Sequence, residues 1–493
     1  MKKSYQKKSY LIIELLQSFT EKEWKGFEQY LSCGFINTNE KLIILLKLLR
    51  KEMHRFDSAD QFLKLMHEKL FGVKLNNSIY LTERQKNNVQ AKISILLKLA
   101  QDFLQLLALR TNEKVGIVLL QQQLLERKQF RLYKQRIKKW IRRSESETEN
   151  VNYFEHQFFV SRNQIDYVTL QAKKDLSLHL QSLKYNLNMF YLLNQLDYYL
   201  VETSLSTQSK LNEINHQSLN VLKHLLELTP YNQHPLLKIY RLIIELFEDR
   251  TEPVFLKLVK LLDELAKEVP KDSLANFYYS LINFCVSKSY EGENIYKKHQ
   301  IEMYRIMDEK NLLLLENNQM QIADLRNMVL QSCRIDEFDW AIHIVNKYYK
   351  HINKKVGNDV KAANLGIIAF YQNQYQQAID YLFPLQSINL AYDVNRRTIM
   401  MKCYYELDEN YLETTHQLYR SFETYIQGNK VLTSKNKTSY KNFIRTLINL
   451  YRIKHNATKI QLESVKIKLK AQKLNSNKSW LEEKMGELSD LKY

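Results

Sequence analysis

The densest cluster of chemically active side chains in the sequence is a basic segment from residue 127 to residue 143. It has nine Lys and Arg residues and no acidic residue. Phe130, Ile137 and Trp140-Ile141 recur within it at helical spacing, which predicts a helix with one packed face and one strongly cationic face. Such a face can neutralise phosphates of a nucleic acid or carboxylates of an acidic protein. The cations are Arg127, Lys128, Arg131, Lys134, Arg136, Lys138, Lys139, Arg142 and Arg143.

A second interpretation of this segment stays open. The cations are also what a solvated face of a repeat helix would carry, and the acidic stretch after Ser144 partly balances them. A further basic segment, from Arg452 to Lys478, has eight Lys and Arg residues and one acid, Glu463. Helical repeat arrays need terminal helices with a polar outer face, so this segment is typical of a C-terminal cap.

The common motifs of catalysis, cofactor binding and metal binding are missing. No two glycines lie closer than Gly26 and Gly34, which excludes the glycine-rich phosphate loops and the nucleophile elbow. The twelve histidines form no HExxH motif, and the cysteines form no CxxC pair. We therefore expect no enzyme activity, no cofactor and no metal. The four cysteines, expected as free thiols, are Cys33, Cys285, Cys333 and Cys403.

The charge of the whole chain is strongly positive. The formal net charge is +19, which favours acidic partners, although a Lys-rich composition is also typical of an AT-rich coding genome. Glu14 interrupts the apolar stretch near the N-terminus, and no apolar run approaches the roughly 18 residues that a membrane span needs. We expect a cytoplasmic protein without integral membrane association.

Composition predicts how these side chains are positioned. The chain has 493 residues but only 9 Gly and 5 Pro, about 3% against an average near 12%. Tight turns between strands need these residues, so the sequence predicts an all-α fold. Capping boxes at Thr20–Glu23 and Thr82–Gln85 mark two helix starts. The predicted regions are an N-terminal helical bundle (1–111), a long-helix middle region (112–230), a helical-repeat array (231–455) and C-terminal basic capping helices (456–493).

The clearest internal repeat lies near residues 320–425. An aromatic residue is followed three positions later by a small one, in the pairs Phe338 with Ala341, Tyr375 with Ala378 and Tyr411 with Thr414. The steps are 37 and 36 residues, which is typical of stacked helical hairpins. The middle copy, with Leu365-Gly366 twelve residues ahead of Ala378, resembles a tetratricopeptide repeat. Val329 and Lys402 stand where that pattern has glycine in the flanking copies.

The chain as a whole resembles an uncharacterised family of bacterial helical-repeat proteins of about this length. The resemblance is carried by Leu15–Trp24 with Phe27 and Leu31, by Phe338–Ala341, and by Asn477–Lys484. It implies the fold class, a tetratricopeptide-like α-solenoid after an N-terminal helical bundle, and implies no activity.

Three functions are consistent with these observations. The first is a non-enzymatic scaffold or adaptor that binds another protein on the concave face of its repeats. The second is a basic nucleic-acid-binding or regulatory protein that uses the face from Arg127 to Arg143. The third, an enzyme of unrecognised type, would need a deep pocket with convergent carboxylates or histidines.

Overall fold

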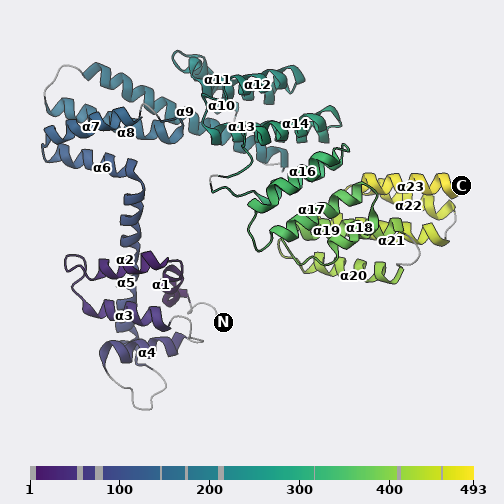
Figure 1. Ribbon diagram of the computed structural model, residues 1–493, viewed down its shortest axis with the longest axis horizontal. Helices are drawn as coiled ribbons and strands as arrows, with labels where there is room; N and C mark the ends of the chain where they lie inside the picture. Colours follow the sequence, from purple (N-terminus) through teal and green to yellow (C-terminus); the bar gives the residue numbers. More distant parts are fainter. Residues whose placement is uncertain are drawn as a thin grey trace. The chain divides into compact units, whose positions relative to one another are not determined.

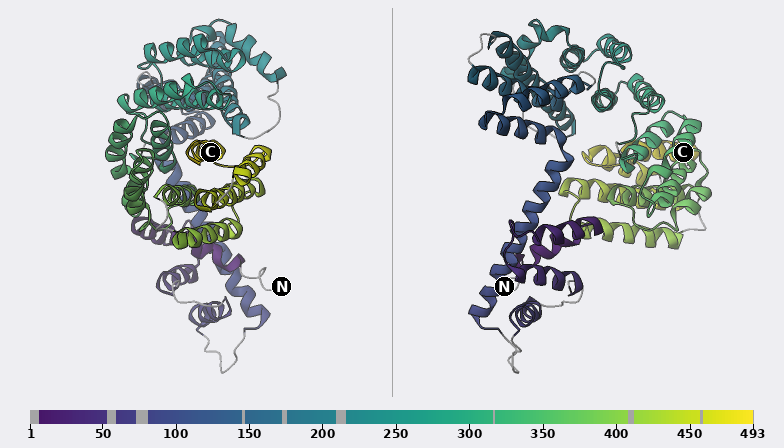
Figure 2. Two further views of the ribbon diagram at one scale, coloured as in Figure 1. Left: turned by 90° about the vertical axis from the view of Figure 1, so that its right-hand side faces the viewer. Right: turned by 60° about the vertical axis from the view of Figure 1, so that its left-hand side comes forward.

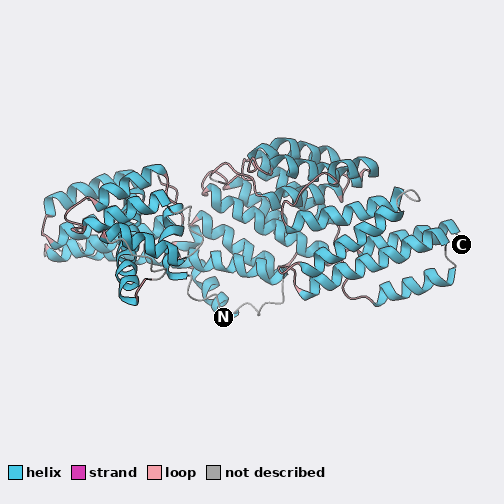
Figure 3. Ribbon diagram, turned by 90° about the horizontal axis from the view of Figure 1, so that it is seen from below, coloured by secondary structure: helices cyan, strands magenta, loops and turns pink. Residues whose placement is uncertain are grey.

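The computed structural model describes residues 7–52, 59–72, 81–144, 147–171, 176–208, 216–315, 317–407, 412–456 and 459–492. These residues form α-helices and no β-strand (Figure 1, Figure 3), which confirms the predicted all-α fold. Their contacts divide the chain into two compact units. The first unit is residues 1–147 with 151–191, and the second is residues 148–150 with 192–493. The boundary falls within α9 (Leu176–Gln208).

The first five helices share one apolar core. Both predicted capping boxes are present, so the helix starts at Glu21 and Glu83 are confirmed. Gly26 allows a close approach, since a Cβ there would lie 3.1 Å from the Phe103 ring. The core is continuous from Ile12 to Phe103. The helices are α1 (Lys7–Gln17), α2 (Glu21–Leu31), α3 (Glu40–Glu52), α4 (Ala59–Phe71) and α5 (Glu83–Thr111).

The rest of the first unit is built from α6 (Glu113–Glu126), α7 (Phe130–Ser144), α8 (Val151–Leu170) and the first part of α9. Asn112 ends α5 and begins α6, and its side-chain oxygen accepts a hydrogen bond from the Val115 amide at 3.3 Å. Helix α6 packs against both α7 and α8. The turn between α6 and α7 is tight because Lys128 adopts a φ of 56°.

The second unit is a series of helical hairpins, and its helix-pair contacts fit a repeat array (Figure 2). The first helices of successive hairpins pack on each other, as α15 does on α17 and α17 on α19. The helices are α10 (His216–Glu227), α11 (Pro235–Asp249), α12 (Glu252–Glu264), α13 (Lys271–Tyr290), α14 (Ile295–Glu309), α15 (Ile322–Cys333), α16 (Phe338–Tyr348), α17 (Gly357–Tyr371), α18 (Tyr375–Leu382), α19 (Leu390–Leu407), α20 (Leu412–Gly428), α21 (Ser434–Asn456), α22 (Lys459–Ala471) and α23 (Lys478–Lys492).

Two joints in this series have the same backbone conformation 37 residues apart. Asp336 and Asn373 adopt φ values of 61° and 62°, in the left-handed region that Asn and Asp tolerate best after Gly. In each joint the following amide donates to a carbonyl five residues back, Glu337 to Ser332 at 2.9 Å and Gln374 to Ala369 at 2.8 Å. This helix ending allows the chain to reverse without glycine.

The C-terminal helices complete the apolar core of the last hairpins. Leu481, Met485 and Leu488 of α23 are buried in one cluster with Phe422 of α20 and Phe443 of α21. Their i, i+4, i+7 spacing is that of an amphipathic helix lying in a groove. The predicted capping segment therefore contributes a packed face as well as a basic one.

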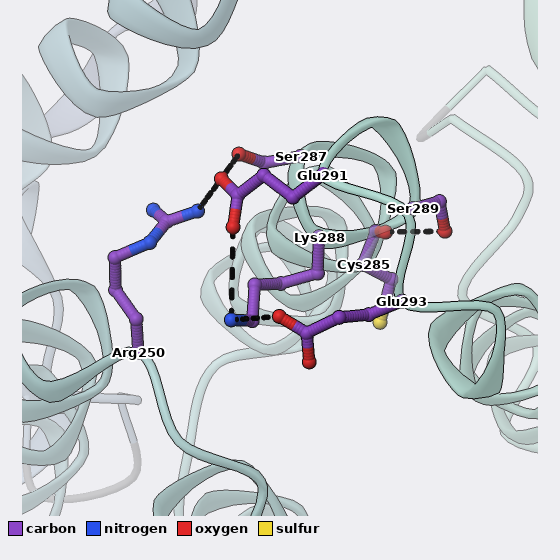
Figure 4. A network of polar contacts seen from close by, with 7 residues as sticks. All are labelled: Arg250, Cys285, Ser287, Lys288, Ser289, Glu291 and Glu293. Atoms are coloured by element: carbon purple, nitrogen blue, oxygen red, sulfur yellow. Dashed lines mark hydrogen bonds and ion pairs between the residues drawn. The ribbon is translucent and has the colours of Figure 1, made fainter.

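A polar network closes the end of α13 in the second unit (Figure 4). Lys288 is 8% exposed and forms ion pairs with Glu293 and, at 3.6 Å, with Glu291. Arg250 ends α11 with a left-handed backbone conformation. Its side chain pairs with Glu291 and donates a hydrogen bond to the Ser287 hydroxyl at 3.0 Å. The network ties α11 to the joint after α13, so these cations are neutralised within the fold.

Candidate functional site

The basic segment predicted from the sequence lies on α7 and the turn before it. All nine Lys and Arg side chains are exposed. Tyr133 and Trp140 lie seven residues apart on the opposite face and are buried. Seven residues are about two helical turns, so the two rings fall on one side of the helix and leave the cations in solvent.

Ring stacking fixes α7 on α8. The Tyr133 and Tyr167 rings stack at 4.9 Å between centroids, and the Trp140 and His156 rings stack at 4.3 Å and 11°. The His156 Nε2 atom lies 2.9 Å from the Lys114 carbonyl oxygen, to which it donates as the neutral tautomer. Burial, and next the Lys114 ammonium, lower the pKa of His156 to about 4, so the ring is neutral at physiological pH.

A groove of about 360 Å³ runs along α7 between α8 and the start of α9, and we call it the α7 groove. Its cationic lining comes from Lys134, Lys138 and Arg142, which follow one another at intervals of four residues. Four residues rise about 6 Å along a helix, so these charges form a row. The remaining lining residues are Tyr133, Ile137, Ile141, Gln164, Tyr167, Val168 and His179.

The other cations of the segment differ in their partners. Arg143 forms an ion pair with Glu113 of α6 at 2.7 Å, and this contact lowers the pKa of Glu113. Arg127 donates to the side chain of Gln123. Within the described part of the chain the remaining seven, including the three of the α7 groove, form no ion pair. Their charge is therefore available to a ligand.

The predicted repeat-packing residues are buried or half-buried where the structure describes them. Ala341 and Ala378 are fully buried, while Phe338 and Tyr375 are half-buried. Tyr411 lies outside the described residues, as does the side chain of Thr414.

At Gly366, helix α17 passes very close to α18. A Cβ at Gly366 would lie 2.7 Å from Leu382 Cγ and 3.3 Å from Tyr381 Cβ. The crossing of α17 and α18 therefore has no room for a larger residue at this position.

Lys402, which stands where the repeat pattern has glycine, is in a setting that sequence reasoning missed. Its ammonium lies 4.8 Å from the centre of the Trp480 ring and 5.6 Å from that of Phe370. Burial, and next the neighbouring Arg334, lower the pKa of Lys402 to about 7. The departure from the repeat pattern was the only sequence signal for this contact.

A second lysine, Lys484, lies near the same Trp480 ring and is paired with two carboxylates. Lys484 of α23 pairs with Glu406 of α19 at 2.9 Å and with Glu487 at 2.8 Å. Burial opposes its charge, but these two carboxylates outweigh burial and raise the pKa of Lys484. Helix α23 is thus held on α19 by polar as well as apolar contacts.

Among the described residues, no group of three or more His, Cys, Asp or Glu side chains is arranged to hold a metal ion. In the same part of the chain, no helix combines the length and the apolar character of a membrane span.

Comparison with known proteins adds no relative. No protein-family model, no curated protein and no solved structure matches the chain. The resemblance to a bacterial helical-repeat family stays a prediction.

Proposed function

We propose that the protein is a non-enzymatic adaptor whose α7 groove binds an acidic, amphipathic helical segment of another protein. The observation that carries this proposal is the row of Lys134, Lys138 and Arg142 beside the apolar side chains of Ile137 and Ile141. An acidic helix with carboxylates at four-residue spacing would match the row of charges. Its apolar face would cover the two isoleucines, which is the usual mode of helix-in-groove recognition.

The aromatic residues of the groove favour a protein over a nucleic acid. Proteins that bind single strands stack bases on exposed rings. Here Tyr133 and Tyr167 stack on each other and are 1% and 8% exposed, so neither ring offers a free face. Nucleic acid remains the second candidate because seven cations that form no ion pair with any described residue could contact phosphates irrespective of sequence.

The lining of the groove also favours binding over catalysis. General acid–base and metal chemistry need carboxylates or several histidines that converge. The described lining of the α7 groove holds one histidine, His179, and no carboxylate. A location in the cytoplasm, where soluble partners are available, belongs to the same proposal.

Fluorescence anisotropy with labelled probes tests the proposal. The probes are a helical peptide of about 20 residues with Glu at every fourth position beside Leu, a scrambled peptide of the same composition, and a DNA strand of equal charge. We expect the amphipathic peptide to bind most tightly. The triple variant K134Q/K138Q/R142Q should weaken that binding at least about tenfold, since it removes three charge contacts.

A matched triple variant is the control. R131Q/R136Q/K139Q removes the same charge from the same helix but outside the groove, and should change the affinity less than about threefold. The variant I141S should weaken the peptide and leave DNA binding unchanged. Equal losses in both triple variants would show general charge attraction and reject the groove. Tighter binding of DNA than of the peptide would support the second candidate instead.

A further inference from the structure

A second groove in the first unit lies on another face of α8. It runs between α6 and α8 and has a volume of about 630 Å³. Its apolar lining is unusually exposed, with Val115 at 44%, Leu119 at 45% and Phe159 at 39%.

The sequence of α6 explains why this surface is incomplete. Its apolar residues are distributed all round the helix instead of along one stripe, which is typical of a helix with neighbours on every side. Helices α7 and α8 cover part of α6, but Val115, Leu119 and Leu120 stay exposed. Val115 and Leu119 lie one helical turn apart and form, with Phe159 of α8, an exposed apolar surface that a partner could cover.

The outer face of α8 carries polar and charged side chains on both sides of Phe159. Glu155 lies four residues before this ring and Arg162 three residues after it. Asn152 and Asp166 lie seven residues before and after. All five side chains are exposed, and their alternating spacing of three and four puts them on one helical stripe. A second α8, turned by 180° about an axis at Phe159, would bring Asn152 opposite Asp166 twice. It would also bring Arg162 twice to within one residue of the position opposite Glu155, a distance that the long arginine side chain can span.

Charge also favours a second copy at this face. The chain has a formal net charge of +19, so two copies repel each other over most of their surfaces. The rim of this groove is neutral, with Lys114 and Arg162 against Glu155 and Asp166. Lys114 is already paired with Glu147 at 2.6 Å, whereas Arg162, Glu155 and Asp166 have no ion-pair partner among the described residues.

We propose that this face is a homodimer interface, in which α8 of one copy packs antiparallel on α8 of a second copy around Phe159. The two α6 helices flank this pair, so the exposed Val115 and Leu119 side chains are covered in a four-helix arrangement. An interface of this kind is isologous, because each contact occurs twice. It uses a different face from the α7 groove, so each surface can be tested without the other.

Sedimentation equilibrium of the full-length protein, from about 1 to 100 µM, tests the dimer. We expect a reversible dimer that F159D abolishes, since the substitution places two carboxylates at the symmetry axis. The variants E155R and R162E should each weaken the dimer at least about tenfold, because each puts like charges opposite one another. The variant R136E makes the same charge change on α7 and should leave the dimer unchanged.

Mixing gives the decisive measurement. E155R and R162E carry opposite charge at the crossing, so an equimolar mixture should form a heterodimer about as stable as the wild-type dimer. The double variant E155R/R162E should dimerise alone. Circular dichroism confirms that each variant is folded. A monomeric wild-type protein at 100 µM, charge variants that dimerise normally, or a mixture without a heterodimer would each overturn the proposal.

Discussion

Helix α7 in the first unit and the hairpins of the second unit both combine buried rings with many cations, yet the cations have different surroundings. All nine cations of α7 and the turn before it lie in solvent, and seven of them form neither an ion pair nor a side-chain hydrogen bond within the described residues. In the second unit Lys288 and Lys484 are each 8% exposed and paired with carboxylates.

Acidic side chains in the second unit show the same pattern as the lysines. Asp308 receives the Lys347 ammonium at 2.7 Å and the Tyr348 hydroxyl, so it joins α14 to α16. Asp324 accepts a hydrogen bond from the Tyr279 hydroxyl at 2.9 Å, between α15 and α13. Charges that hold hairpins together are not available to a ligand. Apart from Arg143, which pairs with Glu113 of α6, the exposed cations of α7 form no ion pair within the described residues, which is why we place binding there.

We expect the largest loss of stability when the ion-pair network at the end of α13 is broken. The variant E291Q/E293Q leaves the Lys288 ammonium buried without a carboxylate, which should reduce the free energy of unfolding by about 3 kcal/mol. The α7 variant K134Q/K138Q/R142Q should change it by less than about 0.5 kcal/mol, because its cations are solvated. Hydrogen exchange of α13 and α7 amides measures both. If both variants lost a similar free energy of unfolding, the cations of α7 would be as structural as those of the second unit.

We expect an intermediate change in stability from Lys402, a buried lysine of the second unit that lies against the Phe370 and Trp480 rings. In the folded protein its pKa is about 7, while in the unfolded chain it is near 10.4. Between these values the unfolded chain binds the additional proton, so stability should rise with pH, by about 2 kcal/mol from pH 7 to pH 9.

Urea unfolding of the wild type and K402M at pH 7, 8 and 9 checks the effect of Lys402. The readout is the difference between the two slopes, since buried thiols such as Cys403, whose pKa burial raises, titrate in both proteins. The variant K354M removes an exposed lysine and should keep the wild-type slope. Parallel pH profiles of wild type and K402M would show that Lys402 does not titrate in this range.

The smallest effect tests the close packing of the repeats. G366A places a methyl group 2.7 Å from Leu382 Cγ, and we expect a loss of about 1 kcal/mol after the helix propensity of Ala is counted. G486A, in the exposed middle of α23 with no neighbouring atom near the added methyl, should instead stabilise by about 0.5 to 1 kcal/mol. Thermal unfolding of both variants shows the two signs. A stabilised G366A would contradict the tight crossing of α17 and α18.

Predictions from the sequence were strongest where they depended on neighbouring residues. The capping boxes at Thr20 and Thr82 involve residues three apart, so their geometry follows from local backbone conformation. The left-handed backbone at Asp336 and Asn373 was not predicted, although Asp and Asn permit that conformation. The distant contacts were missed: nothing in the spacing of Lys402 and Trp480 relates one to the other.

Ile141, expected on the packed face of α7, is instead 41% exposed. The sequence by itself determined the helical fold and the exposed cationic face of α7. These features depend on composition and on periodicity along one helix, which are properties of the chain alone. Tertiary structure decided which cations are neutralised and which stay free, and which rings are buried against each other. Those outcomes depend on the helices that pack alongside. His179 lines the α7 groove only because α9 begins beside α7, and Phe159 lines the second groove only because α6 packs alongside α8.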